Sequence, residues 1–208
     1  MTTFSFHPVK TITSGEGGAI TTNDKNLYQK LKQLVNHGIV RGGKESEKFP
    51  GSWYYEMHEL GYNYRLSDLH AALGISQFKK IDRFVEKRRE IAAFYDESFK
   101  QCSWLTTPFK DDHSYSSYHL YPIQIEFDQI GLTRTQVIEK LREKNVMTQV
   151  HYIPIHLQPY YASNFGFSKG DFPTAEKYYQ HTLSIPLFPG MRESDIETVA
   201  SAVTALAN

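Results

Sequence analysis

A lysine near the start of the chain stands in a setting that suits covalent chemistry with an aldehyde. Lys10 follows an alternating run at residues 3–7 and precedes Gly15, Gly17 and Gly18. The alternation predicts a short strand, and the glycines allow the backbone to turn sharply behind it. An amine held between a strand and a turn can attack an aldehyde carbon and later carry a proton. The pattern therefore makes Lys10 a candidate Schiff-base residue.

A phosphate donor precedes this lysine in the predicted strand. Ser5 lies on the strand face opposite Phe4 and Phe6, and its hydroxyl can donate a hydrogen bond to a phosphate oxygen. The amine and the hydroxyl together would suit an aldehyde that also carries a phosphate. Taken alone, a single lysine is more commonly a solvated surface group, and that interpretation stays open for Lys10 until other parts of the chain support the first one.

Composition narrows the class of partner. The chain has 208 residues, with 23 basic and 23 acidic side chains, so no broad field attracts nucleic acid or an anionic membrane. The expected partner is a small molecule or another subunit. A lone Cys102 excludes an intrachain disulfide, and the sequence shows neither a long apolar run nor a signal peptide. We therefore expect a cytoplasmic protein.

The first half of the chain shows the elements that must position Lys10. Strands are expected at residues 3–7 and 18–22, joined by a bend, and a long loop is expected at 39–60. Asp24 is expected to cap a helix that stops near Gly38. Ser67 should begin the longest helix, which runs for about thirty residues with an interruption at Gly74.

The second half changes to short strands between helices. Strands are predicted at residues 121–125, 147–152 and 184–188, and helices are expected to begin at Thr133, Pro173 and Ser194. This pattern predicts a small α+β domain.

Several blocks of the sequence, taken in order, resemble one enzyme family. Residues 4–18, 36–39, 61–69 and 71–74 are similar to the DegT/StrS group of pyridoxal-phosphate-dependent sugar aminotransferases. Residues 118–122, 149–155 and 184–187 are similar to the same group. Among its members, the chain most resembles the transaminases that make UDP-4-amino-4,6-dideoxy-N-acetyl-altrosamine. The resemblance covers nearly the whole chain.

The resemblance implies an α/β fold, the C-terminal portion of a fold-type-I transferase that depends on pyridoxal phosphate. Residues 1–85 would be the end of the large-domain sheet with the start of a long connecting helix. Residues 86–208 would be the small α+β domain. An upstream half would supply further cofactor contacts, so we expect a C-terminal fragment, and we expect the apolar face around Phe4 and Phe6 to lack its cover.

The resemblance also implies roles for individual residues. Lys10 would bond to the cofactor aldehyde, Ser5 would contact the cofactor phosphate, and Asn63 would reach the phosphate in a neighbouring subunit, which requires a homodimer. Four further side chains would lie near the substrate, namely His37, Arg65, His151 and Tyr152. The substrates would be a nucleotide-linked 4-keto deoxysugar and an amino donor, with glutamate the expected donor.

Two other functions remain open. The chain can be a non-catalytic remnant that only dimerises, or a sugar dehydratase of the same superfamily. The dehydratases resemble this pattern but have a histidine where this chain has Lys10, which disfavours them.

Other suggestive residues have simpler explanations. The chain has nine histidines, but five of them lack a cysteine or acidic companion at ligand spacing, namely His113, His119, His151, His156 and His181. We therefore expect no metal site, and His151 and His156 are expected to line or support a pocket mouth. Residues 15–18 lack the lysine-serine ending of a phosphate-binding loop and are interpreted as a turn. The aromatic residues 53–55 can stack on a sugar or base, although an interface or core role is more common.

Overall fold

The chain folds as two compact units in a computed structural model that describes residues 1–41, 51, 53–111 and 113–207. The N-terminal unit is Met1–Ile81 and the C-terminal unit is Asp82–Asn208. The division falls slightly before the boundary at residue 85 that we drew from the sequence. That the two units are the end of a large domain and a small α+β domain stays a prediction.

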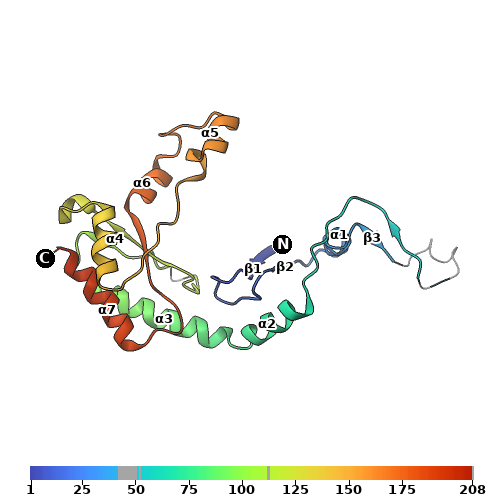
Figure 1. Ribbon diagram of the computed structural model, residues 1–208, viewed down its shortest axis with the longest axis horizontal. Coiled ribbons are helices and arrows are strands. Elements are labelled where there is room, and N and C mark those ends of the chain that lie inside the picture. The colour runs from blue at the N-terminus through green and yellow to red at the C-terminus, as the bar shows by residue number, and fades with distance from the viewer. Residues whose placement is uncertain (42–50, 52, 112, 208) are drawn as a thin grey trace. The chain divides into compact units, whose positions relative to one another are not determined.

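A two-stranded antiparallel hairpin opens the N-terminal unit (Figure 1). Strand β1 (Thr2–Ser5) pairs with β2 (Gly18–Thr21), and Phe4 lies opposite Ala19. The prediction of two strands joined by a bend is confirmed. Helix α1 (Lys25–Leu34) follows, and its N-cap is the predicted Asp24, whose Oδ1 accepts hydrogen bonds from two main-chain amides of the first turn.

The segment predicted as a long loop begins and ends in short strands. Strand β3 (Ile39–Val40) pairs antiparallel with β4 (Glu56–Met57). Residues 42–50 and 52, which belong to this predicted loop, lie outside the described residues. Trp53, Tyr54 and Tyr55 immediately precede β4.

The single long helix expected from residue 67 is wrong, because the structure divides it in two. Ser67 caps α2 (Asp68–Phe78) as predicted, but α3 (Ile81–Ser98) is a separate helix. At the break, Lys80 N donates to Gln77 O at 2.9 Å, so the backbone tightens into a 3₁₀-type turn. No proline or glycine marks this turn, so the sequence carries no local signal for it. The interruption expected at Gly74 does not occur, because Gly74 lies inside α2. A Cβ added to Gly74 would lie 3.4 Å from Ser14 Cβ.

A three-stranded antiparallel sheet forms the centre of the C-terminal unit, with the order β5-β6-β7. The strands are β5 (Leu105–Thr106), β6 (Tyr121–Ile125) and β7 (Thr182–Ile185). The predicted alternation in β6 is confirmed, because Tyr121, Ile123 and Ile125 are fully buried. Their partners in the core come from α3, α4 (Arg134–Glu143) and α7 (Glu193–Thr204). Thr133 caps α4 with a capping box, as the sequence predicts.

Two shorter helices lie between β6 and β7 in the chain. Helix α5 (Pro159–Phe165) lies at the outer end of an arm of the C-terminal unit (Figure 1). Helix α6 (Pro173–His181) returns the chain to β7 and begins at the predicted proline. Neither α5 nor β5 was predicted from the sequence.

Three expectations for this unit need correction. Residues 147–152 form no strand, and only Gln149 bridges to Ser184. The last strand ends at Ile185 instead of continuing to residue 188, since Pro186 has no amide hydrogen to donate. Ser194 is not the cap of α7, because Arg192 occupies the N-cap position and its main-chain amide bonds to the Asp195 carboxylate at 3.0 Å.

The two units differ in what they bury. Every buried hydrophobic side chain among the described residues lies between Ile91 and Leu206, in the C-terminal unit. In the N-terminal unit, the buried described residues are Ser14 and Gly38. The C-terminal unit therefore has a hydrophobic core of its own, whereas the described residues of the N-terminal unit form none.

Candidate active site

Lys10 lies in the connection between β1 and β2, whose backbone is held by main-chain hydrogen bonds. Phe6 N donates to Gly17 O at 2.9 Å, and Ser14 N donates to Phe6 O at 3.1 Å. Lys10 N donates to His7 O at 2.9 Å, which closes a tight turn. The Lys10 side chain is half-buried, and no group in the described part of the chain pairs with its amine. The backbone is thus fixed while the amine is left available.

The hydroxyl groups of Thr13 and Ser14 stabilise the part of this connection that precedes β2. Thr13 Oγ1 donates to Phe6 O at 2.8 Å and accepts from Gly15 N at 2.8 Å. Ser14 is fully buried and donates to Glu16 O at 2.7 Å. These bonds satisfy polar groups at the turn and fix the position from which Lys10 projects.

Ser5 ends β1, just before the Lys10 turn. Its Oγ is at the limit of hydrogen-bond distance from His7 N, which donates to it at 3.5 Å. The hydroxyl hydrogen stays free to donate, and the residue is exposed. Ser5, at the end of β1, and Lys10, in the connection that follows, thus carry a hydroxyl donor and an amine five residues apart.

Two glycines bring a second group of candidate residues together. Gly38 has φ +69°, and a Cβ on it would lie 1.8 Å from the carbonyl oxygen of Glu59. A Cβ on Gly61 would lie 2.1 Å from Gly38 N. Only glycine permits this approach of two backbones. Consequently Tyr62 N can donate to Leu34 O at 2.7 Å.

This contact places three predicted site residues next to one another. Asn63 forms a β-bridge with Asn36, and Arg65 Nη1 donates to Asn36 Oδ1 at 2.7 Å. His37 N donates to Tyr62 O at 2.8 Å, and its backbone has a positive φ of 60°. The side chains of His37, Asn63 and Arg65 are exposed, so they remain available to a ligand. Arg65 is held in place by a neutral amide, which leaves its positive charge uncompensated by that partner.

The other two predicted residues lie in the C-terminal unit. His151 Nδ1 and Ser184 Oγ are 2.8 Å apart, and burial lowers the pKa of His151. Its ring meets the Tyr152 ring edge to face, with 4.6 Å between centroids. The hydrogen bond to Ser184 uses one ring nitrogen and leaves the other for a ligand.

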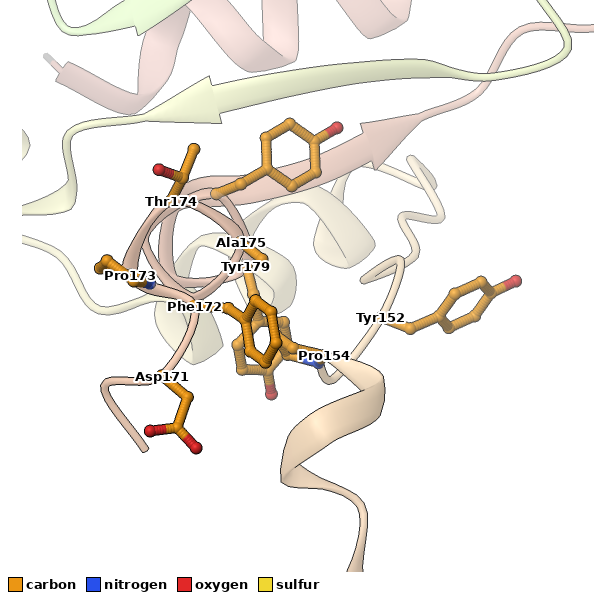
Figure 2. A pocket seen from close by; sticks show the side chains of 9 residues that line it. Tyr152, Pro154, Asp171, Phe172, Pro173, Thr174, Ala175 and Tyr179 are labelled. Carbon is orange, nitrogen blue, oxygen red and sulfur yellow. The ribbon is translucent and has the colours of Figure 1, made fainter. Parts of the chain in front are cut away.

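Tyr152 lines a shallow hollow of ≈ 670 Å³ beside α6. Figure 2 shows the Tyr152 ring standing apart from Phe172 and Pro154, which lie closer to the helix. Among the described residues that line it, Asp171 alone carries a carboxylate. The lining is largely apolar and includes four aromatic side chains, so it suits a flat or apolar face of a ligand more than a multiply charged group.

A buried pair near this hollow was not predicted as a pair. His156 Nε2 lies 2.8 Å from Glu176 Oε1, and both residues are buried. Glu176 Oε1 also accepts from Gly170 N at 2.8 Å. The bond to His156, followed by the bond to Gly170, holds the pKa of Glu176 below its usual value. From the sequence, His156 was expected near a pocket mouth. Its contact with Glu176 was not predicted, because the two residues are 20 positions apart and no local pattern links them.

Two kinds of feature are absent from the described residues. No group of three or more histidine, cysteine, aspartate or glutamate side chains there has the arrangement of a metal site. Within the same residues, no helix is long and apolar enough to cross a membrane.

Comparison with known proteins assigns the family. Residues 1–204 match the DegT/DnrJ/EryC1/StrS aminotransferase family. The chain belongs to this family. The family resemblance stated from the sequence is thus confirmed, and pyridoxal phosphate is the cofactor that this family uses.

Individual relatives of this aminotransferase family cover the chain almost completely. The spore coat polysaccharide biosynthesis protein SpsC of Bacillus subtilis is 41% identical over 203 residues, which are 97% of this chain and 52% of SpsC. A UDP-4-amino-4,6-dideoxy-N-acetyl-beta-L-altrosamine transaminase of Campylobacter jejuni is 39% identical over 203 residues, which are 98% of this chain and 51% of that protein.

Solved structures of the family agree in fold. Helicobacter pylori PseC, an aminotransferase involved in the biosynthesis of pseudoaminic acid, superposes with a TM-score of 0.85 at 32% identity. The match covers 98% of this chain and 52% of PseC. The chain therefore has the α/β fold of about half of a DegT-family aminotransferase, and it spans about half the length of the relatives it matches.

The residues around Lys10 fit a phosphorylated aldehyde cofactor. The amine has no partner among the described residues, and the Ser5 hydroxyl has a hydrogen left to donate. Ser5 ends β1 and Lys10 follows in the connection to β2, whereas His37 and Arg65 lie next to the bridge between Asn36 and Asn63. His151 and Tyr152 are neighbours in the other unit.

Proposed function

We propose that this chain is the C-terminal portion of a fold-type-I sugar-nucleotide aminotransferase. The reaction passes an amino group from glutamate, which leaves as 2-oxoglutarate, to the 4-keto carbon of a nucleotide-linked deoxysugar. The observation that carries the proposal is the unpaired Lys10 amine in a turn fixed by main-chain bonds, within a chain of this family. The proposal includes a cytoplasmic reaction in the biosynthesis of a surface polysaccharide or glycan.

Lys10 and Ser5 would hold the cofactor. The Ser5 hydroxyl would donate to the phosphate, and the Lys10 amine would bind the aldehyde carbon. When bound, pyridoxal phosphate supplies an electron sink for the charge that develops on the substrate carbon. Once displaced from the aldehyde, the Lys10 amine would move a proton to or from that carbon. One lysine can serve both steps because its amine is first a nucleophile and then a base.

The remaining candidates would bind the substrate and the partner subunit. Asn63 would reach the cofactor phosphate of a second protomer, which makes a homodimer part of the proposal. Arg65 offers a guanidinium, the group best suited to a diphosphate, and His37 lies beside it. His151, whose pKa is lowered by burial, would be a neutral hydrogen-bonding group at neutral pH, with Tyr152 next to it.

Cofactor capture by Lys10 is the first test. We expect the purified chain to take up pyridoxal phosphate with an absorbance band near the visible edge, and borohydride reduction followed by peptide mass spectrometry should place the label on Lys10. Because the aldehyde reacts weakly with any exposed lysine, Lys25→Ala in the same unit serves as the matched control. It should keep both the band and the labelled peptide.

The Lys10→Ala variant should lose the band and the label at residue 10. A band of equal strength in Lys10→Ala, with label spread over surface lysines, would show that Lys10 has no special affinity for the aldehyde. That result would contradict the role of Lys10 as the cofactor-binding residue, on which the proposed function depends.

A further inference from the structure

The connection between β1 and β2, residues 6–17, lies close to the start of helix α2. A Cβ on Gly15 would lie 3.2 Å from His70 Cδ2, and a Cβ on Gly17 would lie 2.7 Å from Leu66 Cδ1. His70 is in the first turn of α2, and Leu66 comes just before the helix. At these distances neither glycine has room for a side chain, so the two segments pack closely here.

A third contact lies further along α2. Ser14 is fully buried, and its Cβ is 3.4 Å from the position that a Cβ on Gly74 would occupy. The Ser14 hydroxyl donates to Glu16 O at 2.7 Å, so its hydrogen is used within the connection itself. Residues 14–17, which we call the glycine turn, are thus in contact with the segment that runs from Leu66 to Gly74.

An apolar hollow of ≈ 360 Å³ lies beside these contacts. Ile12 and Thr13 of the connection line it, and so do Ile75 and Phe78 of α2. An empty space provides no atoms to pack against, so it does not support the connection. The contacts at the glycine turn therefore provide the packing between the connection and α2.

The glycine turn is hydrogen-bonded to the start of the connection that contains Lys10. Gly17 O accepts from Phe6 N at 2.9 Å, and Ser14 N donates to Phe6 O at 3.1 Å. Lys10 lies in the chain between Phe6 and Ser14. A displacement of the glycine turn would therefore move the backbone from which the Lys10 amine projects.

We propose that Leu66 and His70 are positioning residues for Lys10, because they hold the glycine turn and thereby set the place of the Lys10 amine. The inference rests on the proposed function, since this position matters only if Lys10 binds the cofactor aldehyde. Displacing a reacting group by about 1 Å can slow a reaction by about a hundredfold. Side chains that do not touch the cofactor can thus control how fast Lys10 captures it.

Competition between two lysines of the same chain tests this positioning. The purified chain is mixed with limiting pyridoxal phosphate and reduced with borohydride, and peptide mass spectrometry gives the ratio of label at Lys10 to label at Lys25. Lys25 is exposed in the same unit and is the internal reference. Leu66→Ala and His70→Ala should each lower this ratio by about tenfold, because each allows the glycine turn to move.

Two variants are the matched controls. Leu69→Ala makes the same truncation three residues beyond Leu66, where the leucine is 85% exposed, and it should keep the parent ratio. His70→Asn should also keep the ratio, because its amide group replaces the ring atoms Nδ1 and Cδ2. Of these atoms, Nδ1 lies 2.9 Å from Ser67 Oγ, and Cδ2 is the atom nearest to a Cβ on Gly15.

Hydrogen exchange of the cofactor-free chain tests the packing itself. Peptides within residues 6–17 should exchange faster in Leu66→Ala and in His70→Ala than in the parent chain, because the glycine turn opens more readily. Exchange at residues 72–78 and 182–185 should stay unchanged. This comparison separates loosening of the turn from unfolding of α2 or of the C-terminal unit.

Three results would overturn the inference. The first is an unchanged labelling ratio in Leu66→Ala and His70→Ala when the parent chain favours Lys10. The second is an equal fall of the ratio in Leu69→Ala, and the third is unchanged exchange at residues 6–17. A parent ratio near one is a separate result, which would contradict the proposed function, and the exchange measurement would still decide whether α2 holds the glycine turn.

Discussion

The buried contact between His156 and Glu176 joins the two ends of the segment that contains α5. Glu176 lies in α6, whereas His156 lies in the 3₁₀ turn Ile155–Leu157 before α5. Glu176 also receives the amide of Gly170. One carboxylate therefore joins both ends of the segment that contains α5. Removing it would leave a buried imidazole and a main-chain amide without their acceptor.

The pH dependence of stability should reveal this carboxylate. Because the folded chain holds the Glu176 pKa below its usual value, the ionised group stabilises the fold above the unfolded pKa of about 4.3, and this contribution is lost as pH falls through the lowered folded pKa. Urea unfolding should therefore show Glu176→Gln to be less stable than the parent chain at pH 7, with the difference narrowing below pH ~4.3.

An exposed glutamate on α4 provides the control. Glu139→Gln should follow the parent chain across the same pH range, because Glu139 is exposed. If the difference between Glu176→Gln and the parent stayed constant from pH 7 to the acid range, ionisation of Glu176 would not contribute to stability.

At the scale of elements, helix caps separate what a local pattern can predict from what it cannot. Thr133 was predicted as a cap and is one, because Gln136 three residues later completes the capping box. Ser194 was also predicted as a cap, but the N-cap of α7 is Arg192, two positions earlier. The reason is that the Asp195 carboxylate accepts from Arg192 N and pairs with its guanidinium.

A comparison of two alanine substitutions tests these caps. Thr133→Ala should lower the free energy of unfolding by about 1 kcal/mol, because it removes the acceptor for the Gln136 amide. Ser194→Ala should change it by less than about 0.5 kcal/mol, because Ser194 lies exposed inside the first turn. Both substitutions lie in the C-terminal unit, so urea unfolding of that unit measures both. Equal losses would mean that Ser194 does cap α7.

The two units bury different amounts of apolar side chain, so we expect them to differ in stability. The C-terminal unit has a continuous core that joins β6 and β7 to α3, α4 and α7. Arg88 contributes from α3, where its buried guanidinium donates to the carbonyl oxygens of Tyr118, His119 and Leu187. Burial lowers the pKa of Arg88. The N-terminal unit has no comparable core among its described residues.

Hydrogen exchange on the isolated chain should expose this contrast. Amides of β6 and β7 should exchange about a thousandfold or more slowly than those of β1 and β2, because opening the core costs ~4 kcal/mol more than opening an uncovered hairpin. The measurement uses mass spectrometry of peptides that span residues 2–21, 121–125 and 182–185. Comparable protection in both units would show that the hairpin is covered in the isolated chain.

The sequence by itself determined the family, the α/β class, the hairpin around Lys10 and the caps at Asp24, Ser67 and Thr133. These features depend on residues that are close along the chain, such as an alternating strand before a glycine turn or a capping box of four residues. For the same reason, the sequence could place Ser5 and Lys10 on one connection. Their roles as cofactor contacts stay predictions.

Only the tertiary structure decided the features that depend on distant residues. It divided the expected long helix at Lys80, joined Glu176 to His156, and brought Asn63 and Arg65 against Asn36 through the contact of two glycine backbones. It also showed that the apolar side chains among the described residues of the N-terminal unit are at most partly buried, and that several, such as Phe4 and Phe78, are exposed. A hydrophobic pattern in sequence marks which side chains need burial, but the packed chain determines which of them obtain it.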